Sequence, residues 1–156
     1  MKFKLSPFEK KDLVIAWLAL AAAFTLGASG ILAVFMQGFS ALSPEKMLLT
    51  FVIALITVGL SFVLHELAHK FAAIKFGYWA EFRKSPQMLV IAVAVAVITG
   101  IVFAAPGATV INTAGRPLSK RENGIISVSG PLVNVLLIIP FAVIMFVGIF
   151  LGGVDA

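Results

Sequence analysis

The apolar residues of the chain gather into four long segments, which are separated by short polar stretches. The segments comprise residues 13–36, 47–76, 88–105 and 125–151. A helix needs about 20 consecutive apolar residues to cross the hydrocarbon core of a bilayer. The first, second and fourth segments exceed this length, and the third falls slightly short of it. The pattern predicts an all-α polytopic membrane protein with three to four transmembrane helices.

Residues that start or stop helices stand at the boundaries of these segments. Ser43 and Pro44 precede the second segment, where serine is expected to cap a helix and proline to occupy its first position. Pro106 and Gly107 follow the third segment and predict its end. No soluble domain, internal repeat or low-complexity run interrupts the pattern. Residues 1–156 are therefore predicted to form a single membrane domain.

The composition places the chain in the membrane and excludes several other classes of protein. Hydrophobic residues make up 61% of the sequence and charged residues 12%, and the mean hydropathy is +1.10. These three values lie far outside the range of soluble domains. Cysteine is absent, so the strong metal ligands available are imidazole and carboxylate. The net charge of +5 lies in short loops, which favours contact with lipid headgroups rather than nucleic acid.

The N-terminal segment has two interpretations. Four lysines precede it, so a cleaved signal peptide with Ala28-Ser29-Gly30 as its processing site is one alternative. The apolar run continues beyond Gly30, and we therefore favour a retained anchor. Trp17 lies within this segment and is expected to pack against neighbouring helices.

A short polar motif, His65-Glu66-Leu67-Ala68-His69, lies near the end of the second apolar segment. Residues four apart share one face of a helix, so both imidazoles are able to bind one metal ion. Glu66 is placed to accept a proton from a metal-bound water. Both histidines of the chain belong to this motif. The alternative is a pair of interfacial histidines beside a glutamate, but ionisable groups inside membrane helices are usually functional.

The chain resembles the site-2 proteases, a family of intramembrane zinc metalloproteases of the M50 type. Family members carry the zinc motif near the end of one helix, as in residues 62–70 here, and a Gly/Pro-containing stretch follows, like residues 104–108. A later helix begins with a Gly-Pro-Leu-x-Asn element, which Gly130, Pro131 and Asn134 match. The resemblance covers most of the chain. It implies Zn²⁺ as cofactor, peptide-bond hydrolysis in transmembrane protein substrates, and a substrate-binding role for these three residues.

The path of residues 88–105 decides the predicted topology. If this segment crosses fully, eight basic residues lie on one side of the membrane and four on the other. If it is re-entrant or otherwise embedded without crossing, eleven of the twelve basic residues share one side and Lys46 alone lies opposite. The second arrangement obeys the positive-inside rule better. We therefore expect a multi-pass protein of the cell membrane, with the N-terminus and the zinc-site face cytoplasmic.

A third metal ligand is missing from the expected position. Catalytic zinc usually has three protein ligands and one open position, and site-2 proteases take the third from an Asp-Gly motif on a later helix. Asp155 follows the fourth segment, but a helix would carry it to the opposite face of the membrane. Glu81 and Glu122 lie on the correct side but in loops. The simplest explanation is an N-terminal fragment or a short family member.

Two functions from different classes remain open. The first is an intramembrane zinc metalloendopeptidase that cleaves membrane-spanning substrates near the cytoplasmic face. The second is a non-catalytic membrane protein of the same fold that binds or regulates partner helices. Gly148 and Gly152 form a small-x-x-x-small pair, which would allow a partner helix or a second copy to approach closely. Internal packing is the favoured explanation of that pair.

Overall fold

The three-dimensional structure is a computed structural model that describes residues 3–29, 43–103 and 105–152. Within these residues, six helical elements and two strands follow one another. They are α1 (Pro7–Ala28), α3 (Pro44–Ala54), the π-helical segment η2 (Leu55–Gly59), α4 (Leu60–Lys75), β1 (Trp79–Lys84), α5 (Pro86–Thr99), β2 (Gly107–Asn112) and α6 (Lys120–Gly152).

In the described part of the chain, three helices are long and apolar enough to cross a membrane, which confirms the predicted class. They are α1, the continuous helix Pro44–Lys75 formed by α3, η2 and α4, and α6. The Ser43 side chain accepts a hydrogen bond from the backbone of Lys46, and Pro44 occupies the first helical turn, as predicted. The first helix begins earlier than predicted, because Ser6 caps it before Pro7. Residues 30–36 of the first apolar segment and Gly30 of the alternative processing site lie outside the described residues.

The third apolar segment forms a short helix whose chain then folds back toward its start. Helix α5 has 14 residues, fewer than the about 20 that a crossing needs. It ends at Gly100, whose φ of 72° lies in the left-handed region that glycine adopts without a steric penalty. The backbone N–H of Ser85 donates to the carbonyl of Pro106 over 2.8 Å. The two ends of the segment therefore lie side by side, in agreement with the re-entrant alternative.

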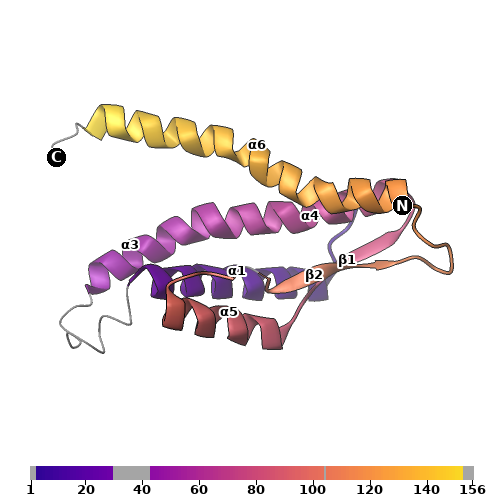
Figure 1. The fold of residues 1–156 in the computed structure, drawn as a ribbon, viewed down its shortest axis with the longest axis horizontal. Helices are drawn as coiled ribbons and strands as arrows, with labels where there is room; N and C mark the ends of the chain where they lie inside the picture. Colours follow the sequence, from indigo (N-terminus) through magenta and orange to yellow (C-terminus); the bar gives the residue numbers. More distant parts are fainter. Residues whose placement is uncertain (1–2, 30–42, 104, 153–156) are drawn as a thin grey trace.

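Strands β1 and β2 join these two ends into a hairpin-like sheet. They pair in antiparallel fashion, from Trp79 opposite Asn112 to Lys84 opposite Gly107. Figure 1 shows this sheet at the end of the molecule where α1 and α6 begin and α4 ends. The sheet is the one departure from a purely helical architecture among the described residues. It brings the stretch after α5 back to the helix that carries the histidines.

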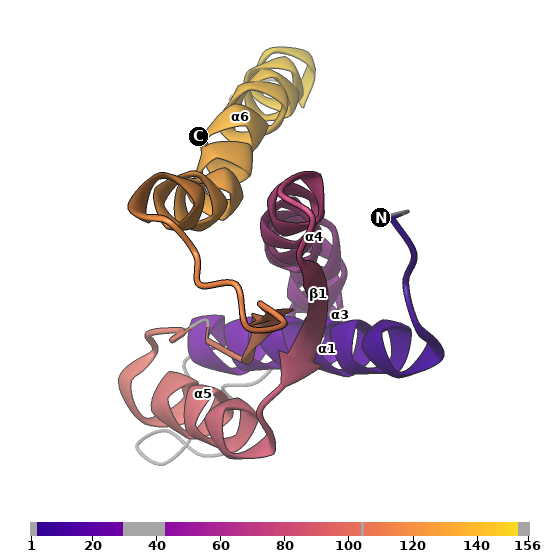
Figure 2. The ribbon, with the colours of Figure 1, turned by 90° about the vertical axis from the view of Figure 1, so that its right-hand side faces the viewer.

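Helix α1 lies at the centre of the arrangement. It packs against α5 on one side and against α3, η2 and α4 on another, and α6 packs against α4. Figure 2 shows α6 set apart from α1, with α4 between them. Helix α4 is therefore held between the packed part of the molecule and a long helix that touches little else.

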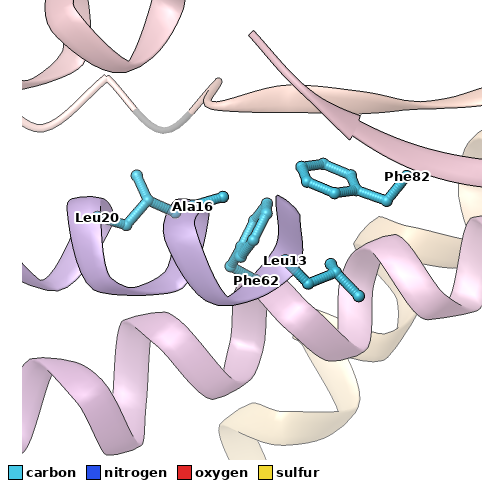
Figure 3. Close-up of a cluster of buried hydrophobic side chains, with 5 residues drawn as sticks. All are labelled: Leu13, Ala16, Leu20, Phe62 and Phe82. Atoms are coloured by element: carbon cyan, nitrogen blue, oxygen red, sulfur yellow. The ribbon is translucent and has the colours of Figure 1, made fainter. Parts of the chain in front are cut away.

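A cluster of apolar side chains fixes α4 against α1 and the sheet. Leu13, Ala16 and Leu20 form one face of α1, and Phe62 of α4 and Phe82 of β1 pack against them (Figure 3). The rings of Phe62 and Phe82 meet edge to face, with centroids 5.5 Å apart. Edge-to-face pairs add about 0.5–1.5 kcal/mol beyond the area they bury. The start of α4 is thus anchored one turn before His65.

Buried polar contacts fix the other end of α4. Lys70 forms an ion pair with Glu9 of α1, and both side chains are almost completely buried. The second oxygen of the Glu9 carboxylate accepts the backbone N–H of Phe82 over 3.1 Å. The Lys70 ammonium also donates to the carbonyl of Lys4 over 2.7 Å. Both oxygens of the Glu9 carboxylate have a donor, and the Lys70 ammonium has two acceptors. A buried ion pair needs such additional hydrogen bonds. The helix turn that carries His69 is therefore held by α1 and β1.

Candidate metal centre

The two histidines of the motif face each other across one side of α4. Their Nε2 atoms lie 3.0 Å apart, and the ring planes meet at 79° with centroids 4.7 Å apart. Two imidazole ligands of a tetrahedral zinc ion, each at 2.0–2.1 Å from the metal, have nitrogens about 3.3 Å apart. The helix spacing of His65 and His69 thus brings the two Nε2 atoms close to the separation of two ligands of one zinc ion, and their role as ligands stays a prediction.

Helix α6 contacts the Nδ1 atom of each imidazole. The Nδ1 atom of His69 lies 2.7 Å from the backbone oxygen of Ile126. The Nδ1 atom of His65 lies 3.1 Å from the side-chain amide nitrogen of Asn134. A carbonyl oxygen accepts only, so Nδ1 of His69 carries the proton and its Nε2 presents a lone pair. Such outer contacts fix the tautomer and orientation of metal-binding histidines.

Gly130 allows the backbone of α6 to approach the two imidazoles closely. A Cβ atom at this position would overlap the Nε2 atoms of both His65 and His69. Any side chain here would displace one or both rings. The closeness of the two Nε2 atoms and the positions that α6 gives to their rings together fit a zinc ion.

Glu66 lies beside the histidines and is held by a residue that the sequence did not identify. Its side chain is 9% exposed, and one carboxylate oxygen accepts the hydroxyl of Thr109 over 2.8 Å. Thr109 belongs to β2, which the pairing with β1 brings to α4. No motif marks it, and only the alternation of residues 107–112 hints at a strand. Thr109 therefore orients the carboxylate that the motif places next to the two histidines.

A cavity of about 440 Å³ opens onto these groups. Its polar lining includes His65, Glu66 and Asn134, and its apolar lining includes Phe62 and Phe141. It therefore extends from the motif along the space between α4 and α6. The arrangement offers a metal-binding pair, an acid-base group and room for an apolar side chain at one place.

A third ligand is not found in the part of the chain that the structure describes. No group of three or more His, Cys, Asp or Glu residues comes together there. Glu81 is bound to Ser6 and Arg83, and Glu122 is bound to Arg116 and Ser119. Both carboxylates are thus engaged away from the histidines. Asp155, the other acid considered, lies outside the described residues.

Comparison with known proteins finds one informative similarity. The chain is 35% identical over 145 residues to a protein of Methanocaldococcus jannaschii that is named "Putative zinc metalloprotease". The aligned region covers 93% of this chain and 66% of that protein. No protein-family model matches the chain, and no solved structure matches it significantly. The similarity agrees with a zinc-dependent peptidase, and the chain spans 66% of the length of this relative.

The Gly-Pro-Leu-x-Asn element lies within α6 and not at its start. Gly130 and Asn134 reach the histidines, as described above, whereas Pro131 is exposed. Pro131 lacks an N–H to donate to the preceding turn, and α6 continues through it. The element therefore brings two residues to the metal centre, and their role in substrate binding stays a prediction.

Proposed function

We propose that this chain carries the core of an intramembrane zinc metalloprotease of the site-2 type, which hydrolyses peptide bonds in membrane-spanning substrates. The observation that carries the proposal is the 3.0 Å separation of the Nε2 atoms of His65 and His69. The Nδ1 atoms of the same two rings contact α6. The name of the M. jannaschii relative supports a zinc-dependent peptidase. The three long apolar helices place the site within a membrane protein.

The proposed roles follow from the positions of the side chains. His65 and His69 would hold the zinc ion, which when bound polarises a carbonyl and acidifies water. Glu66 accepts the proton of the attacking water and later delivers it to the leaving amine. Thr109 keeps the Glu66 carboxylate oriented for both transfers. The third ligand would be a carboxylate supplied from elsewhere, such as another chain.

The substrate would be a membrane helix that unwinds locally, because a peptide bond within a hydrogen-bonded helix is shielded from attack. The apolar part of the cavity beside Phe62 and Phe141 suits an apolar substrate side chain. Asn134 is available to hydrogen-bond the unwound strand. The distribution of basic residues favours a cytoplasmic position for the end of α4 and for the sheet.

A second function is favoured by one observation. The described residues bring together two ligands and no third, and most of α6 is exposed. A protein that kept the fold without turnover would use this apolar helix to bind or regulate partner helices. Weak zinc binding and no cleavage would characterise such a protein.

Zinc content and cleavage separate these functions. We expect Glu66→Gln to retain zinc and to lose cleavage of a detergent-solubilised single-span model protein, because the change removes the base but no ligand. His65→Ala is expected to lose the metal, measured by atomic absorption of the purified chain. Glu45→Gln, which alters an exposed carboxylate at the start of α3, serves as the control. Cleavage retained by Glu66→Gln, or zinc retained by His65→Ala, would contradict the assignment.

A further inference from the structure

The helix that carries the metal-binding motif is interrupted shortly before it. Residues Leu55–Gly59 form the π-helical segment η2, between α3 and α4. A π-helical turn accommodates one residue more than an α-helical turn, and such segments occur frequently at functional sites. Gly59 precedes His65 by fewer than two turns. The rotation of the motif about the helix axis therefore depends on η2.

Trp17 of α1 contacts both ends of this π-helical segment. Its indole N–H donates to the carbonyl of Leu55 over 2.8 Å. At the other end, a Cβ atom on Gly59 would overlap the indole ring. Glycine is therefore required at position 59 for the ring to lie where it does. The sequence alone predicted only packing for Trp17.

The hydrogen bond from Trp17 satisfies a backbone carbonyl that would find no donor in lipid. Backbone carbonyls in the hydrocarbon region need an internal donor, because lipid offers none. Helices deviate from regular geometry where a side chain inserts into the backbone hydrogen-bond ladder. The indole of Trp17 supplies such a donor at Leu55, and the hydroxyl of Thr57 donates to the carbonyl of Ile53 over 2.8 Å. These two donors satisfy one carbonyl within the π-helical segment and one just before it.

Loss of the π-helical geometry would turn the histidines away from their partners. Each residue of an α-helix advances the chain by about 100° and about 1.5 Å. If η2 relaxed into a regular α-helix, the residues after it would rotate by about 100° relative to the residues before it. His65, Glu66 and His69 would then no longer point at Asn134, Thr109 and Ile126, their present partners.

We propose that Trp17 is a positioning residue for the metal centre. Its indole stabilises η2 against Gly59, and η2 sets the rotation of the motif on α4 relative to α6 and β2. The metal-binding consequence rests on the proposed function, whereas the helix rotation does not. Trp17 itself does not contact the zinc ion or substrate.

Zinc affinity provides the first test. Trp17→Phe removes the indole N–H and keeps an aromatic ring, and Gly59→Ala displaces the indole. We expect each to weaken zinc binding about 10- to 100-fold, the usual effect of removing groups that orient ligands. Gly148→Ala is the matched control, because a Cβ atom at this helical glycine meets no other atom within 4 Å. Unchanged affinity in both Trp17→Phe and Gly59→Ala would overturn the proposal.

A one-residue deletion distinguishes positioning from packing. The π-helical segment holds one residue too many for a regular helix, so deleting Ile56 should restore the rotation of α4 when Trp17→Phe has removed the donor. Ile56 is 58% exposed and does not line the cavity beside the motif. We expect the deletion to return the affinity of Trp17→Phe to within a few-fold of the parent. A merely structural role for Trp17 predicts no rescue, and failure of rescue would contradict the proposal.

Disulfide cross-linking reports the helix rotation without zinc. The chain contains no cysteine, and Ala73 and Ile126 belong to one buried cluster between α4 and α6. Ala73→Cys with Ile126→Cys should cross-link in the parent, fail with Trp17→Phe, and recover with the Ile56 deletion. If the parent binds no zinc but shows this pattern, the proposed function fails and the positioning role stands. No cross-link in the parent, or one that Trp17→Phe leaves unchanged, would overturn the positioning role.

Discussion

The two helices that meet at the metal centre, α4 and α6, are held in different ways. Helix α4 contributes Phe62 to the apolar cluster and Lys70 to a buried ion pair, so α1 and the sheet contact it at several points. Helix α6 spans 33 residues but buries only Ile126 and Gly130. One helix is thus built into the core, while the other is attached near its beginning.

Under the proposed function, the two helices have separate roles. Helix α4 carries the proposed ligands, and its packing fixes their positions. Helix α6 contacts both histidines through Ile126, Gly130 and Asn134 and would orient them. Changes on the α4 side should therefore reduce the stability of the fold. Changes on the α6 side should leave the fold intact and alter metal binding.

The largest effect on metal binding without unfolding is expected from Gly130→Ala. The added Cβ atom would overlap the Nε2 atoms of both histidines, so it should abolish zinc binding and not merely weaken it. Gly124→Ala is the matched control, since a Cβ atom at this position in the same helix meets no atom within 4 Å. Zinc titration of both purified variants checks the result. Normal zinc binding by Gly130→Ala would show that the ion does not lie between the histidines.

On the α4 side, we expect the largest loss of stability from Lys70→Met. The change leaves the Glu9 carboxylate buried without its partner, and breaking a buried ion pair in this way costs about 3–5 kcal/mol. Unfolding in mixed micelles of increasing SDS content measures the free energy. Lys75→Met, at an exposed position of the same helix, should have little effect. The double change Glu9→Gln with Lys70→Met should recover part of the loss, and the absence of any loss in Lys70→Met would contradict a structural role for the pair.

The sequence predicts the part of the site that depends on local geometry. His65, Glu66 and His69 are fixed relative to one another by the helix period, so their spacing alone indicates their chemistry. The charge distribution likewise predicts the return of the third segment, since a full crossing would leave an unfavourable balance of basic residues. Both predictions rest on rules that act along the chain or across the membrane as a whole.

The same rules do not predict residues whose contacts come from segments far apart in the sequence. Thr109 reaches Glu66 only because β2 pairs with β1, and Trp17 reaches Leu55 only because α1 packs along the second membrane helix. Neither residue carries a motif, and threonine and tryptophan are ordinary in their segments. Phe82 similarly ends buried against Phe62, although its position in a polar stretch gives no sign of burial.

The smallest expected effect comes from Asn134, where a change on α6 should lower zinc affinity and leave the stability of the fold unchanged. Asn134→Leu removes the side-chain amide beside Nδ1 of His65, and we expect zinc affinity to fall about 10- to 100-fold, or about 1.4 to 2.8 kcal/mol. The fold should keep its stability, because this part of α6 is exposed. Ile138→Ala, one turn further along and 63% exposed, is the matched control and should leave both quantities unchanged.

Asn134→Asp then decides how the amide acts. With zinc on Nε2, the Nδ1 atom of His65 carries the proton and needs an acceptor. The oxygen and nitrogen of an asparagine amide exchange places by a flip of the group, so Asn134 is able to meet that need with its oxygen. An aspartate offers oxygens alone, and Asn134→Asp should therefore retain or strengthen zinc binding in the same titration. If Asn134→Asp weakens zinc binding as much as Asn134→Leu does, Asn134 does not orient His65 by accepting a hydrogen bond from its Nδ1–H. Substrate binding then becomes the better explanation of the place of Asn134 in α6.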